Sequence, residues 1–335
     1  MSSVVSWTEV LEGASPLSEE IIFRSWALDI MARVRGGHGG PRPEGASRRI
    51  FAKGVIGLAN AILVVDRAIP AELAVDHFQP GVHLPAMLRL SNASPSLQAD
   101  NVPDMRGFAM RIGMAGGRFH DLLLVNCPVA FARNARQSRD LVLAWASAPD
   151  MFLARVAQSM GESEAHRIAR QMKDCFRLCA SLAHERFWSA APYLWGDRPA
   201  RFELRPMAAA EPAEAALDHC GDGLSLDFAR RLETGHIGYR LAVQPYVDAK
   251  HTPLEDASVD WLPEISRPIE IASLMIPRQN LEDAKAAALR RRTDMTAFDP
   301  WNAPPRFRPL GSLNRFRRII CEMSLQQRAI IEGGA

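Results

Sequence analysis

The sequence predicts an α+β fold, in which strands and helices occupy separate stretches of one domain spanning residues 1–335. Residues 48–132 and 186–278 contain short apolar runs separated by turn residues, which is the pattern of a strand meander. Residues 17–36, 133–185 and 279–335 carry apolar residues at helical spacing. Because strands and helices do not alternate one by one, parallel βαβ units are not expected.

The elements follow one another in a simple order. Residues 1–47 form an N-terminal helix, SEEIIFRSWALDIMARVR, and a loop rich in Gly and Pro. Barrel-type strands such as HLPAMLRLS and GFAMRI precede the helical insertion at 133–185, and RFELRP, GHIGYRLAVQPYV and PIEIASLMIP follow it. Residues 279–335 contain two helices, NLEDAKAAALRRR and SLNRFRRIICEMSLQQRAII, separated by a Pro-rich break.

Charge and hydropathy exclude several classes of partner. The 40 basic residues nearly balance the 38 acidic ones, for a net charge of +2, whereas nucleic-acid-binding proteins usually show a basic excess. The first residues lack the basic and apolar regions of a secretory signal. No apolar run approaches the roughly 18 residues that a membrane span needs. We therefore expect a cytoplasmic protein without a nucleic-acid or membrane partner.

The cysteines give no sign of a disulfide framework. Their number is odd and their spacing irregular, and a cytoplasmic chain would keep them reduced. Cys175 and Cys179 stand four residues apart in a predicted helix, but no further ligand pair completes a zinc set, which favours a structural role. The five positions are Cys127, Cys175, Cys179, Cys220 and Cys321.

Four collinear segments resemble the catalase superfamily, and together they extend over about residues 45–330. RRIFAKG at 48–54 is similar to the family's R-x-x-H-A-K-G, and LRLS at 88–91 to its R-F-S strand. MRGFA at 105–109 with DLLLVNCPV at 121–129 is similar to R-G-F-A and D-L-V-G-N-N-T-P-V. RRIIC at 317–321, followed by Arg328, is similar to R-x-x-x-Y and a later arginine, and FWSAAPYLWGD at 187–197 resembles a catalase strand region.

The resemblance implies a fold and a cofactor. We expect a catalase-like antiparallel β-barrel with surrounding helices, a C-terminal helix that carries the heme ligand, and heme b as cofactor. The family pairs the heme propionates with three arginines, and the matching positions are Arg48, Arg89 and Arg328. A guanidinium group binds a carboxylate at two points and stays charged when buried, so these residues suit that role.

The proximal ligand differs from that of the family. Where the family places a tyrosinate, this chain has Cys321, four residues after Arg317, so both side chains can share a helix face. A nearby arginine favours the thiolate form of a cysteine. Thiolate is a recognised axial ligand that pushes electron density toward iron. The competing interpretation is a small buried cysteine in a protein that binds no heme.

The distal positions have lost the family's acid–base pair. Phe51 replaces the catalytic histidine and Val125 replaces its asparagine partner, while Ser91 matches the serine that supports the histidine. Without these groups no general base can move a proton across peroxide, so catalase activity should be weak or absent. An apolar distal wall would leave space for an organic substrate.

Three functions remain open at this stage. The first is a heme-thiolate monooxygenase or peroxygenase of secondary metabolism that uses O₂ or peroxide, with a possible electron donor, on a small organic molecule. The resemblance extends to short catalase-related heme proteins of antibiotic biosynthesis, among them the one that forms hydroxyarginine for D-cycloserine, which makes N-hydroxylation of L-arginine a candidate. The second is a hydroperoxide lyase or isomerase of the allene oxide synthase type, and the third a non-enzymatic heme sensor or carrier. We expect a homodimer.

Overall fold

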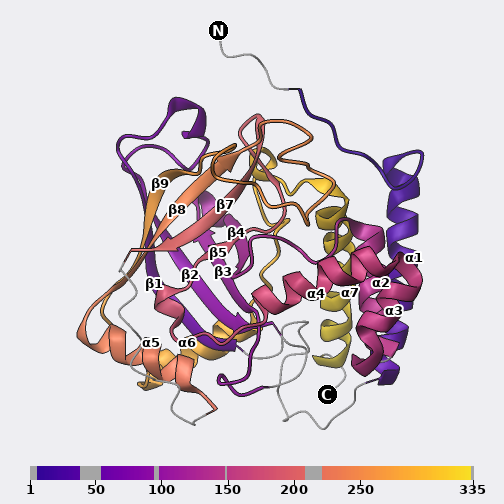
Figure 1. Cartoon of the computed structure of the whole chain (residues 1–335). Helices are drawn as coiled ribbons and strands as arrows, with labels where there is room; N and C mark the ends of the chain where they lie inside the picture. Colours follow the sequence, from indigo (N-terminus) through magenta and orange to yellow (C-terminus); the bar gives the residue numbers. More distant parts are fainter. Residues whose placement is uncertain (1–5, 38–53, 94–97, 148, 208–220, 333–335) are drawn as a thin grey trace.

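The computed structural model describes residues 6–37, 54–93, 98–147, 149–207 and 221–332 (Figure 1). The predicted N-terminal helix is confirmed, whereas the loop after it lies mostly outside these residues. The helices are α1 Pro16–Gly37, α2 Ala135–Ser147, α3 Phe152–Met160, α4 Glu162–Cys175, α5 Gly223–Thr234, α6 Ala284–Met295 and α7 Gly311–Glu332. The strands are β1 Gly54–Val65, β2 His83–Asn92, β3 Arg106–Gly113, β4 Phe119–Val125, β5 Phe187–Trp188, β6 Tyr193–Trp195, β7 Arg198–Pro206, β8 Ile237–Pro245 and β9 Ile269–Ile276.

Eight of the described strands close into an antiparallel barrel. The sheet runs in the order β5-β4-β3-β2-β1-β9-β8-β7, and β5 also pairs with β7, so the two ends of the sheet meet. Strand β6 adds to β7 at one side of the closure. Closure removes the exposed edges that an open sheet would have. The predicted antiparallel β-barrel with surrounding helices is therefore confirmed.

Side chains alternate between the interior and the exterior of the barrel. In β2, Leu88 and Leu90 are completely buried in the main core cluster, whereas Arg89 and Ser91 point to the opposite face. The interior is filled by aliphatic and aromatic residues from every long strand. The barrel is thus a packed core, and a site for a large ligand has to lie on its outer face.

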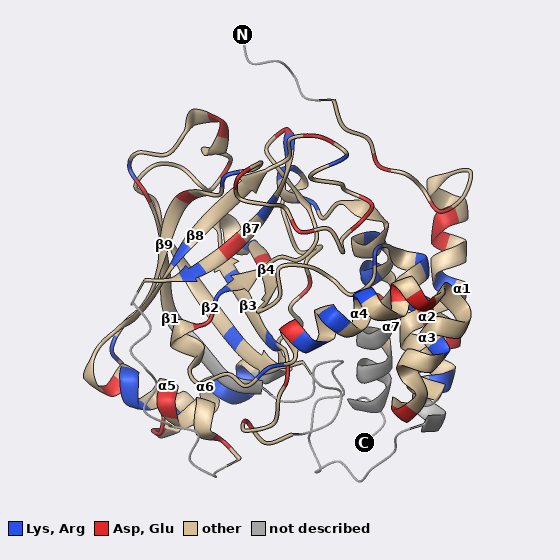
Figure 2. Ribbon diagram, in the orientation of Figure 1, with Lys and Arg blue, Asp and Glu red and all other residues tan. Residues whose placement is uncertain are grey.

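Helices gather beside the barrel and at one end of it (Figure 1). Helix α7 packs against α1 and α2 through a cluster that contains Phe23, Trp26 and Phe316. Helices α5 and α6 lie at the barrel end, and α6 packs against β1. Basic and acidic residues are interspersed on α1 and α4 (Figure 2). In the described part of the chain, no helix combines the length and apolar character that crossing a bilayer requires.

Two predicted boundaries are wrong. The helical insertion ends at Cys175, because the chain extends after it, and Arg177 forms an isolated bridge with Asp104 on the way to β5. Helix α5 lies inside the region predicted as strands. Its core-facing residues Leu224, Phe228 and Leu232 are spaced four apart, so the signal for a helix was present in the sequence.

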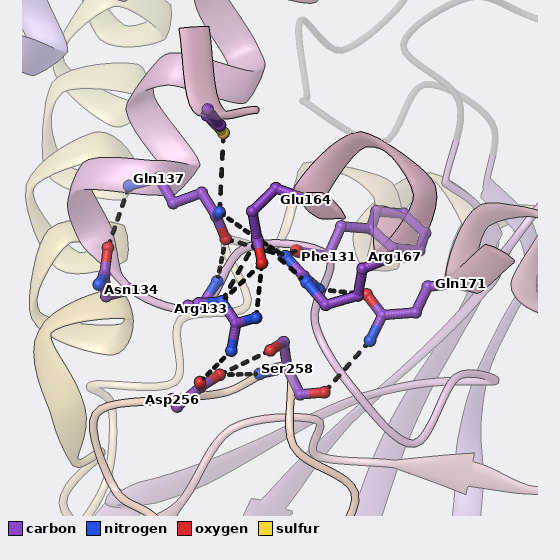
Figure 3. Close-up of polar contacts among 10 residues, drawn as sticks. Phe131, Arg133, Asn134, Gln137, Glu164, Arg167, Gln171, Asp256 and Ser258 are labelled. Atoms are coloured by element: carbon purple, nitrogen blue, oxygen red, sulfur yellow. Dashed lines mark hydrogen bonds and ion pairs between the residues drawn. The ribbon is translucent and has the colours of Figure 1, made fainter. Parts of the chain in front are cut away.

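A polar network fixes the segment after β4 to helix α4 (Figure 3). Arg133 donates to Glu164 Oε1 over 2.6 Å and to Asp256 Oδ2 over 2.5 Å. Arg167 donates to the same Glu164 carboxylate over 2.8 Å and to the backbone oxygen of Phe131 over 2.9 Å. The hydrogen bonds from Arg133 and Arg167 hold the pKa of Glu164 well below its ordinary value. The network therefore orders the chain that leaves the end of β4.

Candidate functional site

The strand register places several predicted site residues in adjacent rows on the outer face of the barrel. Ser91 pairs with Gly107, and Gly107 pairs with Val125, so these three positions form one row. Arg89 lies two residues before Ser91 and therefore belongs to the same face, in the row that also contains Leu123. The structure thus brings Val125 beside Arg89 and Ser91, which lie much earlier in the sequence.

This outer wall combines one buried cation with apolar surface. Arg89 is 5% exposed and Ser91 is 3% exposed, whereas Val125 is half-buried. Gly107 has no side chain, and a Cβ at this position would approach Ser91 Oγ to 2.8 Å. Among these described positions, Ser91 is the polar neutral group, and a serine hydroxyl is a poor base at neutral pH. The wall can hold an anion and an apolar body, but it offers no acid–base group of its own.

Helix α7 presents the predicted ligand and its arginine on one face. Arg317 donates to Asn314 Oδ1 over 3.3 Å, and Cys321 follows one turn later. Arg317 and Cys321 are both half-buried. The opposite side of the helix, with Phe316 and Ile319, is buried against α1 and α2. The packing of that side turns the face with Cys321 away from α1 and α2.

The chain just before α7 connects this face to the outer wall. Trp301 Nε1 donates to the backbone oxygen of Asn314 over 2.9 Å. The backbone N–H of Asp299 donates to Asp121 Oδ2 over 3.0 Å, and the backbone N–H of Asp121 donates to Asn302 over 2.9 Å. Since Asp121 belongs to β4, the segment 299–302 ties the strand that carries Val125 to the helix that carries Cys321.

Tyr193 is a buried residue of β6 to which no role was assigned from the sequence. Its side chain is 2% exposed, and its hydroxyl has no hydrogen-bond partner among the described residues. Burial raises the pKa of Tyr193, the Arg317 guanidinium opposes that increase, and Asp299 and Cys321 add to it. The isolated bridge between Tyr193 and Pro309 holds the tyrosine near the start of α7.

The structure contains a disulfide that the sequence did not predict. Cys127 and Cys175 are bridged, with 5.4 Å between their Cα atoms, so the expectation of five reduced thiols is wrong. The pair could not be predicted from the sequence, because 48 residues separate the two cysteines. The path of the chain through α2, α3 and α4 brings them together. The bridge begins two residues after Val125 and joins the end of β4 to the end of α4.

Some of the predicted site residues lie outside the part of the chain that the structure describes. Arg48 and Phe51 precede the first described residue of β1, and the side chain of Arg328 in α7 is likewise not described. Their roles therefore stay predictions. Asn126, which matched the second family asparagine, is buried and structural: its Oδ1 accepts from the backbone N–H of Arg106 over 2.7 Å, and its Nδ2 donates to Glu185 over 3.2 Å.

Comparison with known proteins identifies the class of fold. Residues 44–166 match the family model for catalase. A bacterial catalase superposes on 98% of this chain with a TM-score of 0.65 and 20% identity. Catalase A from Saccharomyces cerevisiae (94%, TM-score 0.63, 16% identity) and a fungal catalase (94%, TM-score 0.62, 17% identity) give similar values. No curated protein sequence matches the chain.

These matches show that the chain has the catalase fold, as the resemblance of its motifs predicted. The chain spans 63%, 66% and 64% of the length of the three solved catalases, in the order given.

The described residues include side chains whose chemistry fits a heme. Arg89 is a buried cation suited to a propionate, and Cys321 offers a sulfur donor of the kind that ligates heme iron. Gly107 keeps its row free of a projecting side chain.

Proposed function

We propose that this chain is a heme-thiolate oxidoreductase in which the sulfur of Cys321 ligates the iron. The observation that carries the proposal is the position of Arg317 and Cys321, both half-buried and one turn apart on α7, in a catalase fold. Arginine beside a thiol favours the thiolate. At the position where the catalase family has a tyrosinate this chain has Cys321, and the family's arginine is present as Arg317. That arginine favours a negatively charged ligand at position 321.

The residues that would hold heme b come from three parts of the chain. Arg89 would bind one propionate from the outer wall, and by sequence position Arg48 and Arg328 would assist. Arg317 would stabilise the negative charge on the sulfur. A bound thiolate-ligated heme supplies activation of O₂ or peroxide, whereas the protein supplies binding, orientation and electrostatics.

The outer wall argues against peroxide disposal as the main activity. Val125 is apolar, Ser91 is not a base at neutral pH, and Phe51 by sequence replaces the family's histidine. The wall instead suits a small organic substrate that is oxygenated with O₂ or peroxide. N-hydroxylation of L-arginine is one candidate reaction. Its support is the resemblance of this chain, in size and type, to the heme protein that forms hydroxyarginine in D-cycloserine biosynthesis.

Absorption spectroscopy tests the proposal. The ferrous–CO form of the heme-loaded protein should show the red-shifted Soret band of thiolate ligation, and Cys321→Ala should lose it. Cys179→Ala is the matched control, since Cys179 is the other free thiol among the described residues, is completely buried and carries no proposed role. An ordinary Soret position in the wild type would contradict the assignment of the ligand.

A second function has one observation in its favour. Ala109, Leu123 and Val125 are apolar, half-buried and share the outer face, which also suits a long-chain hydroperoxide. A lyase or isomerase would need no external reductant. Rapid loss of the conjugated-diene absorbance of a lipid hydroperoxide, without any donor, would assign this reaction instead of oxygenation.

A further inference from the structure

Arg201 in strand β7 is a buried cation with two unused donors. The residue is 4% exposed, and its Nη1 donates to the backbone oxygen of Val259 over 2.9 Å. Its Nε and Nη2 are buried and have no hydrogen-bond partner in the described part of the chain. Buried N–H groups are rarely left without an acceptor, and the cost is larger when the group is charged. These two donors therefore need an acceptor that the described protein atoms do not supply.

The indole of Trp261 adds a third donor beside this guanidinium group. Arg201 Cζ lies over the Trp261 ring, 4.7 Å from its centroid. Trp261 is 1% exposed, and its Nε1 likewise lacks a partner among the described residues. Gln244 in β8, the strand beside β7 (Figure 1), pairs with Arg201 and donates from Nε2 to the backbone oxygen of Trp261. Two side chains in contact thus present three buried N–H groups, and neither side chain can accept a hydrogen bond.

A second arginine beside β7 shows what Arg201 lacks. Arg186 also lies over a tryptophan, Trp188, with the same 4.7 Å between Cζ and the ring centroid. Its Nε donates to Glu203 Oε2 over 3.0 Å, so its charge is paired. Glu203 stands two residues after Arg201 on the same face of β7, yet its ion pairs with described residues go to other arginines. The nearest carboxylate along the strand is therefore already engaged.

Two aspartates act on the charge of Arg201, but neither forms an ion pair with it in the described structure. Asp256 accepts from Arg133 Nη1 over 2.5 Å, and Asp260 is exposed. Burial lowers the pKa of Arg201 to about 9, and Asp260 and Asp256 oppose this decrease only in part. The protein thus leaves the buried charge incompletely compensated, and an anion at the unused donors would stabilise it.

We propose that Arg201 and Trp261 form a binding site for one small monovalent inorganic anion, such as a halide. The three N–H groups supply its hydrogen bonds, and the guanidinium group supplies the opposite charge. Because both side chains are almost completely buried, the site suits a small anion and not a phosphate ester. The inference does not depend on the proposed function, since neither residue is assigned to heme.

Bromide is the probe, because its anomalous X-ray scattering distinguishes it from water. In crystals of the heme-loaded full chain grown with sodium bromide, one anomalous peak should lie within hydrogen-bonding distance of Arg201 Nη2 and Trp261 Nε1. A water molecule at this position, or no density there, would overturn the proposal.

Thermal unfolding measures the binding in solution. At constant ionic strength, replacing gluconate by bromide should raise the Tm of the heme-loaded wild type along a saturating curve, by about 3 °C. Arg201→Met removes the charge and should show no saturating response. Arg186→Met is the matched control, because it removes an arginine that is stacked on a tryptophan but already paired with Glu203. This control should keep the response of the wild type.

A milder variant keeps the test decisive even where Arg201→Met does not fold. Trp261→Phe removes only the indole N–H, so the bromide concentration for half of the Tm increase should rise about 5-fold. Equal responses in the wild type, Arg201→Met and Trp261→Phe would mean a general salt effect and would overturn the proposal. An anomalous peak without any saturating response in the wild type would also overturn it, because that result means binding at crystal concentration only.

Discussion

The two faces of the sheet formed by β2, β3 and β4 have opposite character. On the inner face every position from Leu88 to Leu124 in the core cluster is aliphatic or aromatic and at most 3% exposed. On the outer face a buried arginine and serine, Arg89 and Ser91, lie beside half-buried Val125. Packing the barrel explains the inner face completely, because close-packed interiors require such side chains.

The outer face mixes polar and apolar side chains. Val125 packs against the small cluster of Cys127, Val129 and Cys175, beside the buried Arg89 and Ser91. In our proposal the outer face binds the ligand, and the inner face is the scaffold that sets its position. The predictions below separate these two roles.

The largest expected effect comes from the Cys127–Cys175 disulfide, which begins two residues after Val125. Cys127→Ser with Cys175→Ser should lower the free energy of unfolding by about 4 kcal/mol, because the unfolded chain regains the freedom of a loop of this length. Urea denaturation of oxidised protein measures the change. Cys179→Ser is the control for loss of a buried thiol, and equal midpoints for the double variant and the wild type would refute the stabilising role.

The next effect concerns the polar pair that the catalase family has and this chain lacks. Phe51→His with Val125→Asn restores the family's polar pair, and peroxide disproportionation by the heme-loaded protein should rise at least about 100-fold. Oxygen evolution is the readout. The apolar double variant Phe51→Leu with Val125→Ile should not show the increase. If the polar variant behaves like the apolar one, the loss of the pair is not what suppresses catalase activity.

A smaller effect follows from removing the cation of the outer face. Arg89→Leu should weaken heme binding about 30-fold, because a hydrogen bond to a charged group contributes roughly 1.5–3 kcal/mol. Heme titration followed by absorbance gives the Kd. With the dimethyl ester of heme, whose propionates carry no charge, wild type and variant should bind alike. Equal Kd values with ordinary heme would mean that Arg89 serves the fold only.

The last effect concerns the pH dependence of stability and belongs to the inner face. His120 Nδ1 lies 3.1 Å from His77 Nε2, and burial lowers the pKa of His77 to about 4 and that of His120 well below 6.5. Below pH 6.5 the unfolded chain binds protons that the folded chain excludes. Stability is therefore complete above pH 6.5 and falls as the pH decreases toward 4, by at most about 1.4 kcal/mol per unit for each proton.

Urea denaturation at pH 6.5 and at pH 5 measures that loss. His77→Gln with His120→Gln should make the free energy of unfolding less dependent on pH in this window, with no change in heme affinity. An unchanged pH dependence would show that the pair is not the source. The acid sensitivity would then belong to the carboxylates of the surface.

Much of the fold could be predicted because alternation and helical spacing are local signals. The run from Leu84 to Ser91 alternates as a barrel strand should, and α7 follows its apolar spacing. The two-residue strand β5 could not be predicted, since its pairing with both β4 and β7 is a property of closure. The Cys127–Cys175 bridge depends on the path of three helices, which spacing does not encode.

The site was predictable only where a motif spans it. Arg317 and Cys321 stand one turn apart in the sequence, so their common face follows from helix geometry. The position of Tyr193 near the start of α7 could not be predicted in this way, because it depends on strand pairing and the bridge to Pro309. A buried tyrosine is ordinarily a core residue, and only its unsatisfied hydroxyl distinguishes it.

X-ray absorption at the iron edge tests the central claim most directly. In the heme-loaded wild type, the nearest neighbours of iron should include one sulfur atom in addition to the heme nitrogens, and Cys321→Ser should lose that sulfur. A wild-type iron surrounded by nitrogen and oxygen alone would contradict the assignment of Cys321 as the axial ligand.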